Sequence, residues 1–178
     1  WAANNLNEGD HILLTEMEHH SNIVPWQMIS ERKNFIIDFI KVDKNGLLNF
    51  DDIDRLITNK TKLVSIVHQS NVLGTINPIK DIIRKAHSHG SLVLIDGAQS
   101  IAHQEIDVQD LDCDFFVFSG HKIYGPTGVG VLYSKAEILS QISPLFGGGE
   151  MIDQVTKKKF TLNETPWRFE AGTPPIAQ

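Results

Sequence analysis

The stretch TKLVSIVHQSNVLGTINPIKDIIRKAHSHGSLVLIDGAQS, residues 61–100, holds two apolar runs with a helical segment between them. Both runs, residues 61–70 and 91–100, are almost continuously apolar until their ends, which is typical of strands buried on both faces. Residues 77–90 predict a helix, because Pro78 suits a first turn, the basic residues come late and Gly90 follows the end. The stretch therefore predicts a strand–helix–strand unit of a parallel sheet.

The same alternation continues on both sides of this stretch. A helix is expected over residues 21–33, with Ser21 or Asn22 as its cap and Pro25 in its first turn. Asn49 is expected to cap a second helix, which starts with acidic residues that suit the helix dipole. Further strands are expected at residues 11–15, 35–42, 114–120 and 128–134. The pattern predicts an α/β fold with a mainly parallel sheet and helices on both faces.

Composition and charge exclude several classes of protein. The 178 residues are 41% hydrophobic and 21% charged, as in an ordinary globular chain. The net charge of −6 argues against a nucleic-acid partner, and no apolar stretch approaches the ~18 residues that a membrane span needs. The only cysteine, Cys113, rules out an internal disulfide and fits a reducing, cytoplasmic location. Both ends of the sequence look cut, so we expect a longer protein.

Ligands of open parallel sheets bind outside the carboxyl ends of the strands, so the residues that follow each strand are the candidates for a site. Polar side chains gather there: His19, His20, Asn71, Asp96, Gln99, Ser119, His121 and Lys122. Each of them has a plain structural explanation when taken alone. Asp96 would then be a helix cap, and Lys122 a lysine facing solvent after a strand.

Taken together, the residues around Lys122 indicate a covalent cofactor. A lysine amine attacks carbonyls to form a Schiff base. Ser119 and His121 can donate hydrogen bonds to a phosphate, and the neighbouring glycines allow close backbone approach. Pyridoxal 5′-phosphate (PLP) carries both an aldehyde and a phosphate, and its pyridine nitrogen needs an acidic partner, a role that Asp96 fits.

Three other kinds of site are less well supported. His19 and His20 beside Glu18 suggest a metal, but adjacent side chains point apart and no other cluster supplies ligands. The segment YGPTGVG lacks the spacing of a phosphate loop, and its lysine precedes the glycines. No G-x-G-x-x-G follows an early strand, so a dinucleotide site is unsupported.

Six segments of the chain resemble a known family in the same order. They are MEHHSNIVPWQ, SNVLGT, DGAQS, DCDFFVFSGHKIYGPTGVGVLY, GGGEMI and WRFEAGTP. They resemble the large-domain motifs of group II (SufS-type) cysteine desulfurases, which are PLP enzymes of the class V aminotransferase group. The resemblance implies the type I aminotransferase fold. It also implies that residues 1–178 are part of the large cofactor-binding domain, without the N-terminal phosphate loop and the C-terminal small domain.

The resemblance implies a role for each candidate residue. Lys122 resembles the lysine that holds PLP and later moves protons on the substrate, and Asp96 resembles the partner of the pyridine nitrogen. Gln99 resembles the residue that binds the phenolate oxygen of PLP. His19 resembles the histidine that stacks on its ring.

The remaining roles concern the phosphate, the substrate and a second subunit. Ser119 and His121 resemble phosphate ligands, and Asn71 resembles an asparagine near the phenolate oxygen and the substrate carboxylate. Thr173 resembles a threonine that reaches the phosphate bound by the other subunit, which implies a homodimer with sites at its interface.

The function implied is removal of sulfur from L-cysteine, giving alanine and an enzyme persulfide that supplies iron–sulfur cluster assembly through an acceptor protein. Cys113 does not match the family's catalytic cysteine, so that residue and the substrate-binding arginine are expected outside the chain. Two alternatives remain in the same group: a selenocysteine lyase acting on L-selenocysteine, and another class V activity such as an amino-acid lyase or epimerase. A non-catalytic partner domain with this fold is the alternative from another class.

Overall fold

The computed structural model describes residues 1–176, which form two compact units. The first unit, Ala2–Ser134, contains a six-stranded sheet. The second unit begins at Lys135 and also includes Trp1; it contains a two-stranded hairpin.

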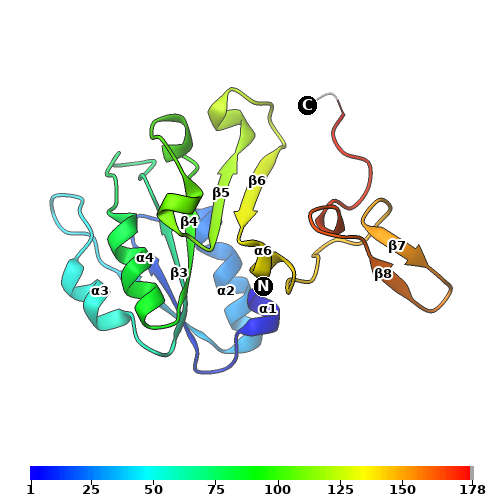
Figure 1. Ribbon diagram of the computed structural model, residues 1–178. Helices are drawn as coiled ribbons and strands as arrows, with labels where there is room; N and C mark the ends of the chain where they lie inside the picture. The colour runs from blue at the N-terminus through cyan, green and yellow to red at the C-terminus, as the bar shows by residue number, and fades with distance from the viewer. Residues whose placement is uncertain (177–178) are drawn as a thin grey trace. The chain divides into compact units, whose positions relative to one another are not determined.

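The sheet of the first unit has the strand order β2-β1-β3-β4-β5-β6 (Figure 1). Strands β1 to β5 pair in parallel, and β6 runs antiparallel to β5. The bounds are β1 His11–Thr15, β2 Ile36–Ile40, β3 Thr61–Val67, β4 Leu92–Asp96, β5 Phe115–Ser119 and β6 Gly130–Ser134. The predicted α/β fold with a mainly parallel sheet is confirmed.

Helices connect the strands and cover the sheet. In Figure 1, α3 and α4 lie in front of the sheet and α2 lies behind it. The bounds in this unit are α1 Ala2–Asn5, η1 His20–Asn22, α2 Val24–Lys33, α3 Phe50–Leu56, α4 Ile79–Ser88, η2 Ser100–Ala102, α5 Val108–Leu111 and η3 Gly120–Ile123.

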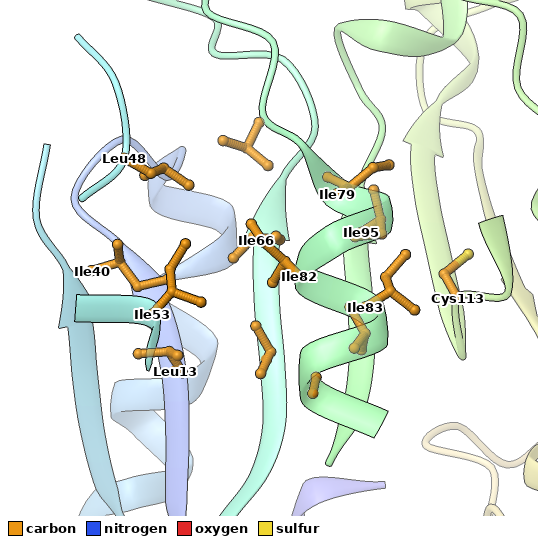
Figure 2. Packing of buried hydrophobic residues seen from close by; sticks show 14 of the residues in the cluster. Leu13, Ile40, Leu48, Ile53, Ile66, Ile79, Ile82, Ile83, Ile95 and Cys113 are labelled. Atoms are coloured by element: carbon orange, nitrogen blue, oxygen red, sulfur yellow. The ribbon is translucent and has the colours of Figure 1, made fainter. Parts of the chain in front are cut away.

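The main core lies between α4 and the sheet (Figure 2). Helix α4 buries one stripe of side chains, spaced as one face of an α-helix requires: Ile79, Ile82, Ile83 and Ala86. Burial of each isoleucine stabilises the fold by roughly 1.5–3 kcal/mol. Strand residues alternate, so a second set is buried outside this cluster: Ile12, Leu14, Leu63 and Phe115. The near-continuous apolar strands are therefore buried on both faces, as predicted.

The predicted cap of α2, Ser21 or Asn22, is wrong. The short helix η1 comes first, and α2 begins at Val24 with Ile23 at its cap position and no side-chain cap bond. Asn22 does not cap α2 because its amide bonds Glu18 and Ser65 instead. Pro25 does lie in the first turn, as expected.

The second unit holds little regular structure. Helix α6, Ala136–Leu139, is followed by strands β7, Ile152–Val155, and β8, Phe160–Leu162, and by η4, Trp167–Phe169. Strands β7 and β8 pair antiparallel. Within residues 1–176, no helix is both long enough and apolar enough to cross a membrane.

Candidate functional site

Seven of the eight predicted site residues line one cavity of about 420 Å³ at the carboxyl edge of the sheet. They lie at the ends of strands or in the segments that follow them, and the parallel topology brings these strand ends to one edge. These seven are His19, Asn71, Asp96, Gln99, Ser119, His121 and Lys122. Three residues that sequence reasoning did not select complete the lining: Ser21, Val67 and Ala98.

Asp96 is the last residue of β4 and is held from both sides. Its backbone pairs with Val67 of β3 and with Val117 of β5. The side chain is buried, and its Oδ1 accepts a hydrogen bond from the Ala98 backbone N–H at 2.9 Å. The carboxylate is therefore fixed in the cavity wall before any ligand binds.

Gly97 lets the turn after β4 lie directly on β5. A Cβ atom at this position would fall 2.0 Å from the ζ carbon of Phe116, so no other residue fits without displacement of that ring. The Gly97 N–H donates to the Val117 carbonyl at 2.9 Å. This close packing fixes the turn that leads to Gln99, which lines the cavity together with Ser119 and Lys122.

Lys122 lies in η3, the single turn that follows β5. The turn is closed by bonds from Gly120 N–H to Val129 O and from Gly125 N–H to Gly120 O, at 2.8 and 2.9 Å. A Cβ on Gly125 would lie 2.8 Å from that Gly120 oxygen, which explains the glycine. Lys122 is half-buried and lines the cavity, and the backbone around it is constrained.

His19 caps η1 and has a defined tautomer. Its Nδ1 accepts from the Ser21 backbone N–H at 3.2 Å and lies 2.8 Å from Ser21 Oγ. A backbone N–H only donates, so Nδ1 carries no proton and the neutral ring is protonated at Nε2. The ring is thereby oriented by its own turn at the rim of the cavity.

Glu18, which precedes His19, is buried beside the cavity lining. Its Oε1 accepts from Thr15 Oγ1 at 2.6 Å and from Val67 N–H at 2.9 Å, and its Oε2 accepts from Asn22 Nδ2 at 2.7 Å. Burial raises the pKa of Glu18 to about 7, opposed by these three donors and assisted by the nearby charge of Asp96. Sequence reasoning weighed Glu18 only as a metal ligand. Residues 1–176 hold no group of three His, Cys, Asp or Glu side chains placed for a metal.

The lining fits a small phosphate-bearing aldehyde. The cavity volume of about 420 Å³ is within the range of small-molecule sites. Its wall offers one amine, one buried carboxylate, and the side-chain donors of Gln99, Ser119 and His121. These are the groups that the aldehyde, the ring nitrogen and the anionic oxygens of PLP require.

Two further residues are not among those that line this cavity. Thr173 belongs to the second unit and is exposed, so its role towards a partner subunit stays a prediction. Cys113 is completely buried just before β5. Its burial agrees with the expectation that it is a structural residue and not the sulfur acceptor.

Known proteins are similar to this chain in sequence and in fold. A relative from Halalkalibacterium halodurans, named probable cysteine desulfurase, is 53% identical over 173 residues, which are 97% of this chain and 43% of that protein. The crystal structure of the cysteine desulfurase CsdA from Escherichia coli matches with a TM-score of 0.96 at 42% identity, over 99% of this chain and 44% of that one. The chain thus spans less than half the length of these relatives.

A more distant structural match keeps the same fold. A mutant of C-DES with glycine covalently linked to its PLP cofactor matches with a TM-score of 0.83 at 31% identity, over 95% of this chain and 46% of that one. The family model described as aminotransferase class-V matches residues 1–178, the whole of the sequence. With its parallel sheet and with Lys122 and Asp96 in one cavity, this chain belongs to the class V aminotransferase family.

Proposed function

We propose that the protein containing this chain is a PLP-dependent cysteine desulfurase. The observation that carries the proposal is that Lys122 and Asp96, from the ends of different strands, line one cavity with His19 and Gln99. It is supported by relatives named cysteine desulfurase at about half identity and by PLP in a structural neighbour.

Each residue has a role set by its own chemistry. Lys122 would hold the cofactor through its amine and, once released by the incoming substrate, move a proton at the substrate carbons. Asp96 would accept a hydrogen bond from the pyridine nitrogen and keep it protonated. When bound, PLP supplies an electron sink for negative charge that develops on the substrate.

The other lining residues would bind and orient. Ser119 and His121 would donate to the phosphate, and Gln99 to the phenolate oxygen. His19 would stack on the ring with its Nε2 proton available to a neighbouring oxygen, and Asn71 would bind near the substrate carboxylate.

In the proposed reaction, the carbon–sulfur bond of L-cysteine breaks and the sulfur is transferred to an enzyme thiol as a persulfide. The thiol proton balances the new C–H bond of alanine, so no external oxidant or reductant is needed. Cys113 is fully buried, so the thiol belongs to a residue outside these 178. We further propose that the protein is a cytoplasmic homodimer that passes sulfur to an acceptor protein for iron–sulfur cluster assembly.

The test is to incubate the full-length protein with L-cysteine and to measure alanine and sulfide. Alanine is expected in an amount equal to the sulfur released, and its absence contradicts the proposal.

A structural neighbour, the cystine C–S lyase C-DES in complex with cysteine persulfide, supports a lyase as the second candidate. Formation of pyruvate instead of alanine would favour that lyase. A preference for L-selenocysteine would favour a selenocysteine lyase.

A further inference from the structure

We propose that Glu18 is a positioning residue for the cofactor site, which acts by holding His19 in place in the cavity lining. The inference rests on the proposed function, because it assigns to Glu18 a part in binding the same cofactor. Glu18 does not line the cavity itself, but its sequence neighbour His19 and its hydrogen-bond partner Val67 both do.

Glu18 ties together three segments that converge on the site. Thr15 is the end of β1, Val67 is the end of β3, and Asn22 is the end of η1, and all three donate to this one carboxyl group. The bond from Asn22 closes the loop on both sides of His19, because the chain enters it at Glu18 and leaves it at Asn22. The Asn22 N–H also donates to the His19 carbonyl at 2.8 Å. The place of His19 is thus fixed relative to β3, which pairs with the strand that carries Asp96.

The orientation of Asn22 permits only an acceptor at Glu18 Oε2. The indole N–H of Trp26 donates to Asn22 Oδ1 at 3.1 Å, and an indole has no acceptor with which to accommodate a flipped amide. Ser65 Oγ donates to the same oxygen at 2.7 Å. The Asn22 amide nitrogen must therefore face Glu18, and the Val67 N–H fixes Oε1 as an acceptor in the same way.

A carboxyl group at position 18 can satisfy all three of these donors, whereas an amide cannot. If Glu18 is protonated, the proton can point to Thr15 Oγ1, since a hydroxyl can reverse its role from donor to acceptor. An amide at position 18 would instead place its NH₂ against either Asn22 Nδ2 or the Val67 N–H. One buried donor would then lose its acceptor, and the loop that carries His19 would shift to relieve the contact.

The experiment measures the equilibrium dissociation constant of PLP from the full-length protein by absorbance, with Tm measured on the same samples. Glu18→Gln is expected to weaken binding by roughly tenfold, because one buried donor that holds the His19 loop loses its acceptor. Thr15→Val is the milder second variant, because it removes one donor and keeps the other two. We expect it to weaken binding by about threefold.

Two further variants separate positioning from general stability. Because Glu18 is proposed to act through His19, Glu18→Gln and Thr15→Val should have no added effect on PLP binding in a His19→Ala background. Adding Trp26→Phe to Glu18→Gln frees the Asn22 amide to flip and accept from the new amide, so it should restore most of the lost affinity.

Each result supports or contradicts the inference. A fall in Tm with unchanged PLP affinity means that Glu18 is merely structural, which overturns the inference. A loss of affinity that persists in the His19→Ala background overturns it too. If the unsubstituted protein binds no PLP, the proposed function itself fails, whereas equal binding by the unsubstituted protein and Glu18→Gln contradicts the inference alone.

Discussion

At the scale of single residues, Glu18 makes the stability of the fold depend on pH. Burial raises its pKa from 4.5 to about 7, so between these values the folded state holds a proton that the unfolded chain releases. The stabilisation linked to this proton is complete below pH 4.5 and is lost as the pH rises through about 7. The full loss corresponds to about 3 kcal/mol.

The matching experiment compares Tm of the full-length protein and of Glu18→Gln between pH 5 and pH 8. The advantage of the unsubstituted protein is expected to shrink as pH rises. Glu8→Gln, which removes an exposed glutamate, is the matched control. A difference that stays constant or grows over this range would show that the carboxyl is already ionised throughout.

Much of the site could be predicted from the sequence, because most site residues lie at the end of a predicted strand or directly after it. Lys122, Asp96 and Asn71 could be selected since parallel strands end at one edge. Glu18 was not recognised as a support of the site, because its partners Val67 and Asn22 become neighbours only in the folded sheet. Its position just before His19 was the one available signal.

At the scale of elements, the presence of each strand was predicted better than the residue at which it ends. Strand β3 ends at Val67, three residues before the predicted limit at Ser70. The His68 carbonyl accepts from the Asn77 N–H and the Ser70 N–H donates to the Thr75 carbonyl, so these residues bond within the following turn. The cap of α2 was missed for a similar reason. Asn22 has the right side chain for a cap, but tertiary partners use it. Such competition between local and distant hydrogen bonds is not visible in a sequence.

The contact between the turn after β4 and strand β5 predicts a strong effect of Gly97→Ala. The added methyl would overlap the Phe116 ring, which costs about 1–3 kcal/mol and moves the turn that carries Gln99. The Tm of the full-length protein and the amount of PLP that it retains should both fall. Gly147→Ala is the control, since its Cβ meets nothing within 4 Å. Adding Phe116→Leu should make the loss less than additive, and strict additivity would show that the two residues do not compete for space.

Helix α3 offers a test of a cap predicted from sequence. Asn49 Oδ1 accepts from the N–H groups of Asp51 and Asp52 at 2.9 and 3.4 Å. Asn49→Ala should lower the free energy of unfolding in urea by about 1 kcal/mol, whereas Asn49→Asp keeps an acceptor and should have little effect. Equal losses in both variants would mean that the cap bond is not the source of the stability.

At the scale of the whole molecule, the proposed homodimer predicts complementation between defective subunits. If Thr173 serves the partner's site, a mixed dimer of Lys122→Ala and Thr173→Ala subunits has one site with both defects and one with none. Co-expressed, differently tagged full-length subunits should then regain about half of the activity per dimer, measured as alanine formed. Activity no higher than that of the separate variants would show that Thr173 serves its own chain or no site at all.

The proposed function depends above all on Lys122 as the residue that binds PLP covalently. Borohydride reduction of the full-length protein with PLP, followed by peptide mapping, tests it most directly. Lys122→Ala is the control and should yield no adduct. A single pyridoxyl adduct on Lys122 is expected, and an adduct on any other lysine, or its persistence in Lys122→Ala, would show that Lys122 does not bind the cofactor.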